Sequence, residues 1–301
     1  MSTIQLNNNT KIPVLGLGTW QSSPEEVYTA VLHALKTGYR HIDTAFAYDN
    51  EESIGRAIHD SGIPRDELFI TTKLWCTYHQ VPQEGLKESL KRLGLEYVDL
   101  YLMHWPVPLN PKGNDPKFPT LPDGNRDIVE GWDFVKTWEK MQELVGNGTK
   151  SVGVSNFDVE NLERLLEAPS TKIVPVANQV ELHPHLPQHK LLKFAKAKGI
   201  VLEAYSPLGS TNSPLLTEPE LVKIAEKYQV STATILISWA IWRGTVVLPK
   251  SITPKRIESN FKTVKLDDVD GKTIDDLHKT IGIKRFINPN WYPVTVFHGD
   301  E

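Results

Sequence analysis

Short apolar runs recur along the chain and alternate with segments whose apolar residues repeat at helical spacing. The apolar runs begin near residues 14, 39, 68, 98, 150, 174, 200 and 245. The helical spacing predicts helices over 51–60, 82–93, 132–145, 159–167, 188–198 and 218–242, the last with a break at 229–232. Strands that alternate with helices in this way predict an α/β protein with a parallel sheet.

The N-terminal part of the chain carries clear start and stop signals. Ser23, Pro24 and Glu26 form a capping box with proline in the first turn, and the apolar repeat that follows ends at Gly38. Ahead of this predicted helix, residues 3–6 and 11–14 alternate around a polar stretch, which is typical of a small β-hairpin.

Eight strand–helix units in 301 residues fit a closed (β/α)8 TIM barrel, with the N-terminal hairpin as a plug. An open, doubly wound sheet is the alternative that the same pattern leaves open. The segments 104–131 and 205–217 follow predicted strands and are too long for simple connections, so we expect functional loops on the C-terminal rim. No linker divides the chain, and we expect residues 1–301 to form a single domain.

Composition narrows the class of protein. A charged fraction of 23% and a net charge of −4 are ordinary for a soluble protein and give no reason to expect nucleic acid or a membrane as partner. Cys76 is the only cysteine, which excludes an internal disulfide and suits a reducing compartment. The N-terminus lacks the basic and apolar regions of a secretory signal, so we expect a cytoplasmic protein.

Titratable side chains stand where predicted strands end. Asp43, Lys73 and His104 each directly follow an apolar run, and Tyr48 comes five residues after the aspartate. In a barrel these ends meet on the C-terminal rim. We expect Asp43 to hold Lys73 as an ammonium group, which would lower the pKa of Tyr48 and let this phenol protonate a carbonyl oxygen. A buried ion pair beside a core histidine is the structural alternative.

A phosphate-binding pattern lies late in the chain. The strand end at 246–251 is followed by a helix start at Thr253 and Pro254, with Lys250 and Arg256 on either side. A helix N-terminus between two cations is a site for phosphate, although a capped helix with solvated charges fits the same residues. The glycines near residue 16 do not form a dinucleotide fingerprint, because the third glycine is missing.

Taken together, these motifs resemble the aldo-keto reductase superfamily over nearly the whole chain. The motifs are 38–45 (GYRHIDTA), 48–51 (YDNE), 70–75 (ITTKLW), 99–106 (DLYLMHWP), 153–157 (GVSNF), 178–181 (NQVE), 204–209 (AYSPLG) and 249–251 (PKS). Within the superfamily, the chain is most similar to the fungal glycerol dehydrogenase and carbonyl reductase branch. The resemblance implies an NADPH-dependent oxidoreductase that reduces aldehydes and ketones to alcohols, with alcohol oxidation as the reverse reaction.

The resemblance also implies roles for individual residues. The catalytic tetrad would be Asp43, Tyr48, Lys73 and His104, with Tyr48 as the proton donor. NADPH would lie across the rim, with its nicotinamide stacked on Tyr205 and its carboxamide held by Ser155, Asn156 and Gln179. Ser206, Leu208 and Ser210 would line the pyrophosphate, Lys250, Ser251 and Arg256 would bind the 2′-phosphate, and Asn260 would face the adenine. Many relatives have Glu where Ser259 stands, which leaves an adenine contact there open.

An aromatic substrate pocket follows from the same resemblance. Its candidates are Trp20, Phe46, Trp75, Trp105 and Trp291, although simple packing is the alternative for Phe46 and Trp75. Two further functions stay open, a pentose reductase of the xylose type and a non-catalytic NADPH-binding regulatory subunit. We expect a monomer without a metal, because the spacing of His183, His185 and His189 does not specify a ligand geometry.

Overall fold

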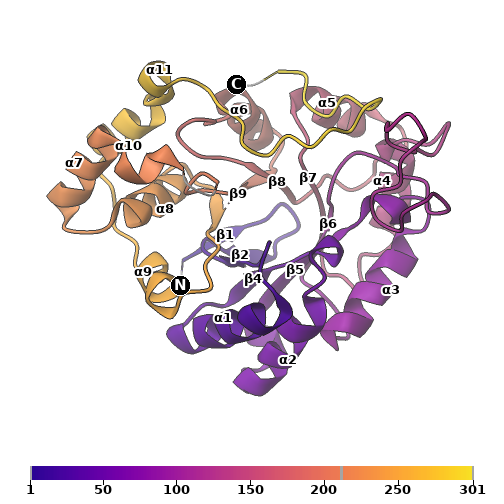
Figure 1. Ribbon diagram of the computed structural model, residues 1–301, viewed down its shortest axis with the longest axis horizontal. Helices are drawn as coiled ribbons and strands as arrows, with labels where there is room; N and C mark the ends of the chain where they lie inside the picture. Colours follow the sequence, from indigo (N-terminus) through magenta and orange to yellow (C-terminus); the bar gives the residue numbers. More distant parts are fainter. Residues whose placement is uncertain (1, 211–212, 300–301) are drawn as a thin grey trace.

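The computed structural model describes residues 2–210 and 213–299, and its main feature is a sheet of eight parallel strands surrounded by helices (Figure 1). The strands are β3 (Leu17–Gly18), β4 (His41–Asp43), β5 (Phe69–Leu74), β6 (Leu100–Met103), β7 (Val152–Ser155), β8 (Ala177–Glu181), β9 (Val201–Tyr205) and β10 (Val246–Leu248). They are ordered in space as they are along the chain. Each strand therefore pairs with the next one.

The sheet closes on itself between its first and last strands. Parallel bridges join Leu15 to Val247 and Gly18 to Lys250. The amide of Val247 donates to the carbonyl of Val14 over 2.8 Å, and the amide of Gly16 donates to the carbonyl of Val247 over 3.0 Å. The TIM barrel prediction is confirmed, and the open doubly wound sheet is excluded by these closing bonds.

A two-stranded hairpin covers one end of the barrel. Strands β1 (Thr3–Gln5) and β2 (Lys11–Pro13) pair antiparallel and lie across the ring of strands in Figure 1. Leu6 and Ile12 are buried in one apolar cluster with inward-facing strand residues such as Leu102 and Val246. The hairpin is therefore the predicted plug, and it leaves the opposite end of the barrel free for a site.

The helices surround the barrel and largely follow the predicted pattern. They are α1 (Pro24–Thr37), α2 (Glu51–Ser61), α3 (Pro82–Leu93), α4 (Phe134–Gln142), α5 (Val159–Glu167), α6 (His189–Ala197), α7 (Pro219–Tyr228), α8 (Thr232–Trp242), α9 (Pro254–Phe261), α10 (Asp268–Asp275) and α11 (His278–Ile281). Helix α1 has the expected capping box, and Gly38 ends it in a left-handed conformation. The predicted break separates α7 from α8, because the Ser231 side chain caps a new helix.

One predicted helix is too long, and two short helices were missed. Helix α4 is shorter than the predicted 132–145, because Asp133 caps it through the amide of Lys136 and the last turn loosens after Gln142. The short helices α10 and α11 were not predicted. Their few turns give little apolar periodicity, and the cap that Asp267 provides through the amide of Asp270 is a weak signal by itself.

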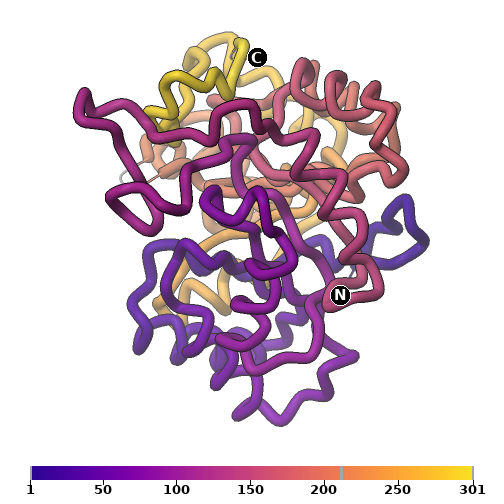
Figure 2. The backbone as a smooth tube through the Cα atoms, turned by 90° about the vertical axis from the view of Figure 1, so that its right-hand side faces the viewer, coloured from indigo at the N-terminus to yellow at the C-terminus, as the bar shows by residue number. Residues whose placement is uncertain are grey.

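The C-terminal tail and the long loop after β6 cover the rim opposite the plug. Figure 2 shows both segments at the same end of the molecule, and the amide of Arg126 donates to the carbonyl of Tyr292 over 3.0 Å. The tail is also held by the carboxylate of Glu181, which accepts the amides of Phe286 and Ile287. Chain segments far apart in sequence thus form the walls of this end.

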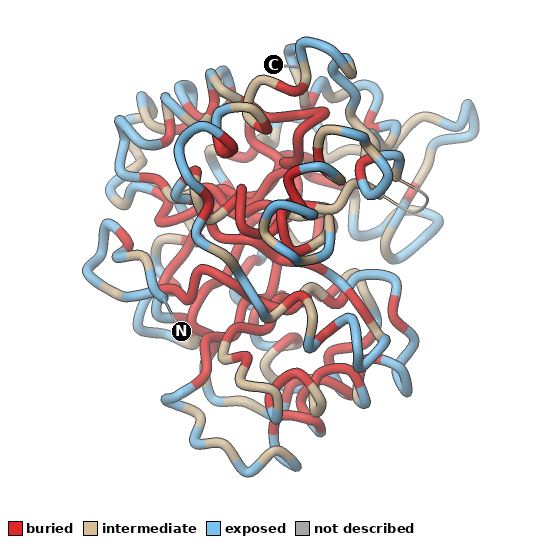
Figure 3. Tube along the Cα trace, turned by 90° about the vertical axis from the view of Figure 1, so that its left-hand side faces the viewer, coloured by how far each residue is buried: buried red, intermediate tan, exposed pale blue. Residues whose placement is uncertain are grey.

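Buried residues concentrate along the barrel strands and the inner helix faces, while outer faces and loop tips are exposed (Figure 3). Apart from the cluster under the plug, a large cluster fills the space between sheet and helices, and a smaller aromatic cluster lies at the rim. No helix in residues 2–210 and 213–299 has the length and apolar character needed to cross a membrane.

Candidate active site

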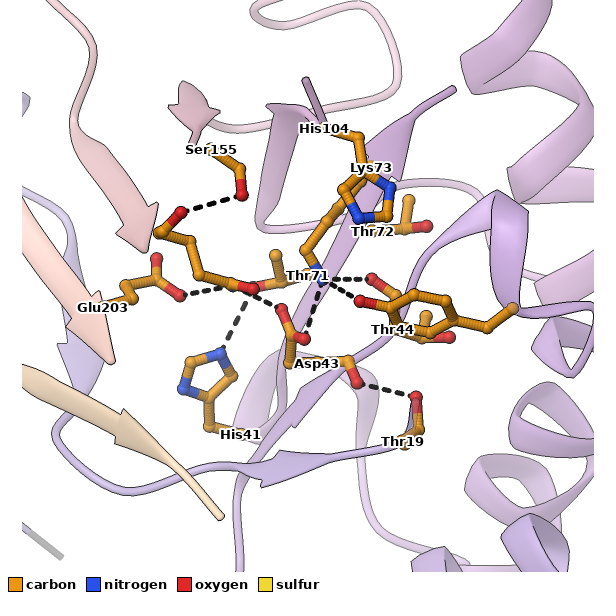
Figure 4. Close-up of polar contacts among 12 residues, drawn as sticks. Thr19, His41, Asp43, Thr44, Thr71, Thr72, Lys73, His104, Ser155 and Glu203 are labelled. Atoms are coloured by element: carbon orange, nitrogen blue, oxygen red, sulfur yellow. Dashed lines mark hydrogen bonds and ion pairs between the residues drawn. The ribbon is translucent and has the colours of Figure 1, made fainter. Parts of the chain in front are cut away.

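A buried ion pair lies at the rim end of the barrel interior. The Nζ atom of Lys73 donates to Oδ1 of Asp43 and to the carbonyl of Thr44, both over 2.8 Å (Figure 4). Burial by itself lowers the pKa of Lys73, but attraction to Asp43 and Tyr48 outweighs it and raises this pKa above its ordinary value. Lys73 is therefore an ammonium group held in place inside the barrel.

Tyr48 presents its hydroxyl to this ammonium group. It lies in the short helix η1 (Phe46–Tyr48) after β4, and its hydroxyl is 3.4 Å from Nζ of Lys73. Burial raises the pKa of Tyr48, and the opposing effect of Lys73 does not overcome it. The expectation that Lys73 would lower the pKa of Tyr48 is wrong for the net value. Removing the phenolate from water costs more free energy than its attraction to the ammonium group provides. Tyr48 is a neutral phenol with a proton to donate.

His104 faces the same point from β6. It directly follows the strand, and its ring meets the ring of Tyr48 edge-on at a centroid distance of 5.7 Å. Burial, and then the charge of Lys73, hold the pKa of His104 well below its ordinary value. The imidazole is therefore neutral at physiological pH, and one of its two ring nitrogens carries a proton that can be donated. The structure thus brings together all four residues of the predicted tetrad.

Polar side chains from β7 to β9 continue the site on the other side. The side-chain amide of Asn156 donates to the carbonyl of His104 over 2.9 Å, and its oxygen accepts the hydroxyl of Tyr205 over 2.7 Å. The hydroxyl of Ser155 donates to the backbone carbonyl of Gln179 over 2.8 Å. These bonds fix the side chains that the sequence predicts around a nicotinamide ring.

Gln179 connects this side to the ion pair. Its side-chain nitrogen donates to Oδ2 of Asp43 over 2.8 Å and to Oε2 of Glu203 over 3.1 Å. Glu203 lies in β9, is fully buried, and was missed by sequence reasoning. Burial, and then the charge of Asp43, raise the pKa of Glu203 to about 8. The sequence feature that could have indicated this residue is an acidic side chain inside the apolar run at 200–205.

A cavity of about 990 Å³ opens at this end of the barrel. Every residue predicted to bind cofactor lines it, and so do Asp43, Tyr48 and His104, while Lys73 lies buried beneath. Of the predicted substrate residues, the four tryptophans line the cavity and Phe46 does not. Phe46 instead packs edge-on against Tyr78, with the guanidinium of Arg92 4.1 Å from its ring centre, and the packing alternative describes it correctly.

Several cavity-lining residues were not predicted from the sequence. They come from loops and helix starts that are distant along the chain, and they include Thr19, Gln21, Phe118, Leu216, Ser231, Thr232, Ala233, Ile252, Ile287 and Pro289. Ser231 ends the connection between α7 and α8, and Thr232 and Ala233 begin α8, where the sequence shows only a helix break. Ser259 also lines the cavity, next to Asn260.

One end of the cavity is cationic. Lys250 and Arg256 are exposed beside the start of α9, and Ser251 fixes the chain there by accepting the amide of Thr253 over 3.1 Å. Within the part of the chain that the structure describes, Arg256 forms no ion pair. An anion bound at this end would meet an unpaired guanidinium next to a helix N-terminus.

The other end of the cavity is aromatic. The ring centre of Trp291 lies 5.2 Å from that of Trp105 and 6.3 Å from that of Trp75, which in turn meets Phe118 at 5.1 Å. Trp291 is buried, and its indole N–H has no hydrogen-bond partner among the residues that the structure describes. This end can therefore hold an apolar group and offer one hydrogen bond to an oxygen.

The three histidines considered as metal ligands have other hydrogen-bond partners. Nε2 of His183 lies 2.7 Å from the carboxylate of Glu181, and Nδ1 of His185 lies 3.0 Å from the carbonyl of Gly282. Across residues 2–210 and 213–299, the structure contains no cluster of three or more His, Cys, Asp or Glu side chains arranged to hold a metal ion.

Comparisons with known proteins agree with this geometry. The Aldo/keto reductase family model matches residues 14–279. The chain is 55% identical to the Glycerol 2-dehydrogenase (NADP(+)) of Saccharomyces cerevisiae, covering 98% of this chain and 96% of the relative. It is also 55% identical to Aldehyde reductase YPR1 of the same yeast, covering 98% and 97%. A solved structure, the aldose reductase from Schistosoma japonicum, superposes with a TM-score of 0.87 at 38% identity, covering 95% of this chain and 94% of that one.

The raised pKa of Glu203 predicts how stability depends on pH. In the unfolded chain this carboxyl has its ordinary pKa of 4.5, so between about 4.5 and 8 the folded protein binds one more proton than the unfolded chain. Stability therefore falls as pH rises through this window. In Glu203→Gln this contribution is absent, and we expect a smaller drop in melting temperature between about pH 6 and pH 9 than in the wild type. Equal drops in both proteins would mean that Glu203 is already ionised when folded.

Proposed function

The chain belongs to the aldo/keto reductase family of NADP-dependent oxidoreductases that act on aldehydes and ketones, and we propose that the cluster of Asp43, Tyr48, Lys73 and His104 is its catalytic centre. The observation that carries this assignment is the neutral phenol of Tyr48, which lines the cavity 3.4 Å from a fully buried ammonium group. Such a phenol can give its proton to a bound carbonyl oxygen.

The residues present fit NADPH. The cavity joins the tetrad to the cationic end, where the unpaired Arg256 and Lys250 would hold the 2′-phosphate and Asn260 would face the adenine. Ser206, Leu208 and Ser210 line the same cavity, and the pyrophosphate would pass along them. Tyr205, Ser155, Asn156 and Gln179 would hold the nicotinamide beside the tetrad. When bound there, NADPH supplies the hydride.

The tetrad supplies the proton that the substrate oxygen must receive when the hydride is transferred to the carbonyl carbon. As negative charge develops on the substrate oxygen, Tyr48 donates its proton and becomes a phenolate. The ammonium of Lys73 stabilises that anion, and Asp43 keeps the ammonium in place. His104, neutral because of burial, can donate a second hydrogen bond to the same oxygen. In alcohol oxidation, the reverse direction, the phenolate would accept the proton.

The substrate is, in this proposal, a small aldehyde or ketone held by Trp20, Trp75, Trp105 and Trp291. The names of the two yeast relatives, an alcohol dehydrogenase acting on glycerol and an aldehyde reductase, support this class. They do not favour either a pentose reductase or a non-catalytic regulatory subunit. We also infer one barrel domain acting as a monomer in the cytoplasm. The single, buried cysteine supports only the reducing compartment.

Replacing Tyr48 tests the catalytic assignment. Tyr48→Phe keeps the ring but removes the proton donor, so turnover of aldehydes should fall by about 10² or more while NADPH affinity is retained. Turnover is followed through NADPH absorbance with a panel of aldehydes and ketones, and affinity by fluorescence titration. Near wild-type turnover in Tyr48→Phe would exclude Tyr48 as the acid, and a wild type inactive on the whole panel would exclude the proposed function.

Replacing Arg256 tests cofactor choice. A charge-assisted hydrogen bond contributes about 1.5–3 kcal/mol, so Arg256→Ala should bind NADPH about tenfold or more weakly. NADH lacks the 2′-phosphate, and its affinity should change little. Lys255→Ala is the matched control, because Lys255 is equally exposed on α9 but does not line the cavity. An equal loss for both cofactors would place Arg256 away from the 2′-phosphate.

Replacing Trp291 tests the substrate end. Apolar contacts around the reacting group change selectivity by about 1–3 kcal/mol each. Trp291→Ala should therefore alter the ratio of kcat/KM between an aryl ketone and a small aldehyde, with NADPH affinity nearly constant. Tyr292→Ala is the control, since its side chain is 60% exposed outside the cavity. If both substrates lose activity by the same factor, Trp291 does not set specificity.

A further inference from the structure

We propose that Glu203 is a positioning residue for carbonyl reduction, which fixes the side-chain amide of Gln179 so that its nitrogen points into the barrel and its oxygen is available to the nicotinamide carboxamide. This inference deepens the proposed function and rests on it. Glu203 is fully buried, does not line the cavity and can touch neither substrate nor cofactor. It therefore acts through Gln179.

The orientation of the Gln179 amide follows from its two neighbours. Its nitrogen lies 2.8 Å from Oδ2 of Asp43 and 3.1 Å from Oε2 of Glu203. Turning the amide over would place its oxygen, an acceptor, against the carboxylate of Asp43. Two acceptors in contact repel, and the N–H bond to Asp43 would be lost, so Asp43 determines which end of the amide points into the barrel and Glu203 accepts the second hydrogen of the nitrogen.

Asp43 by itself is not enough to hold this orientation. An amide nitrogen carries two hydrogens, and Asp43 Oδ2 accepts only one of them. Without Glu203 the second hydrogen would have no acceptor in the barrel interior, where an unmade hydrogen bond is costly. Rotation of the side chain toward the cavity would then compete with the observed position.

The amide oxygen of Gln179 is the group that this arrangement leaves for a ligand. It makes no hydrogen bond to any residue that the structure describes, and Gln179 lines the cavity beside Tyr205. An acceptor at this point suits the NH2 group of a carboxamide. Glu203 thus prepares a binding contact from inside the barrel without reaching the cavity itself.

The protonation state of Glu203 is compatible with this role. A second carboxylate beside Asp43 would compete for the ammonium of Lys73, on which Tyr48 depends. Burial and the charge of Asp43 raise the pKa of Glu203 to about 8, opposed by the hydrogen bond from Gln179 and by the charge of Lys73, so near neutral pH Glu203 is mostly an uncharged acid. An uncharged carboxyl still accepts the Gln179 N–H and leaves the ion pair undisturbed.

Two substitutions of similar size separate the role from simple packing. Glu203→Gln keeps an acceptor oxygen, whereas Glu203→Met removes it. We expect NADPH to bind about two- to tenfold more weakly to Glu203→Met than to the wild type, which corresponds to the loss of one neutral hydrogen bond. Glu203→Gln should bind NADPH with the affinity of the wild type. Affinity is measured by fluorescence titration, after circular dichroism and melting temperature show that both variants are folded.

A cofactor analogue makes the test specific for the carboxamide. The reduced acetylpyridine analogue of NADPH carries an acetyl group in place of the carboxamide and has no N–H to donate. It should bind wild type and Glu203→Met with the same affinity, whereas a general loosening of the site would weaken both ligands equally. Equal losses, or unchanged NADPH affinity in Glu203→Met, would overturn the role of Glu203. A wild type that binds NADPH but reduces no carbonyl compound would instead contradict the proposed function.

Discussion

The site depends on one buried ion pair. Lys73 is fully enclosed by the barrel, and an ammonium group in such a place is stable only because Asp43 and a backbone carbonyl receive it. That requirement determines which strand ends must be neighbours. Strands β4 and β5 pair in parallel with Asp43 opposite Thr71, and Lys73, two residues further along β5, reaches Asp43 with its long side chain. The pairing of β4 with β5 therefore serves both the barrel and the site, because it brings the two charged side chains together.

Burial favours the uncharged form of each neighbour of this pair. It keeps Tyr48 protonated, keeps His104 neutral and raises the pKa of Glu203, while Lys73 remains charged. A proton donor, a neutral hydrogen-bond donor and a fixed cation thus lie within one small volume. The fixed cation stabilises Tyr48 most when the phenol loses its proton, because only then does Tyr48 carry a negative charge beside it.

The barrel separates this fixed centre from the cationic and aromatic ends of the cavity, to which we assign cofactor affinity and substrate selectivity. The tetrad stands on strand ends and on the short turn after β4, whereas the cationic end lies at the start of α9 and the aromatic end is built from the long loop and the C-terminal tail. The loop and tail are tied to each other by the bond between Arg126 and Tyr292 and pack together in the rim cluster. Residues there can change without disturbing strand pairing.

The sequence by itself determined the alternation of strands and helices, the cap of α1, the break before α8, and the tetrad, with Asp43, Lys73 and His104 at strand ends and Tyr48 five residues after Asp43. These are local patterns, visible as periodicity, caps and the residue that ends an apolar run. Only the tertiary structure decided that Phe46 packs outside the cavity, that Glu203 borders the ion pair and that the net pKa of Tyr48 rises. Burial and charge proximity arise from segments that meet across the barrel, and no local window of the chain contains that information.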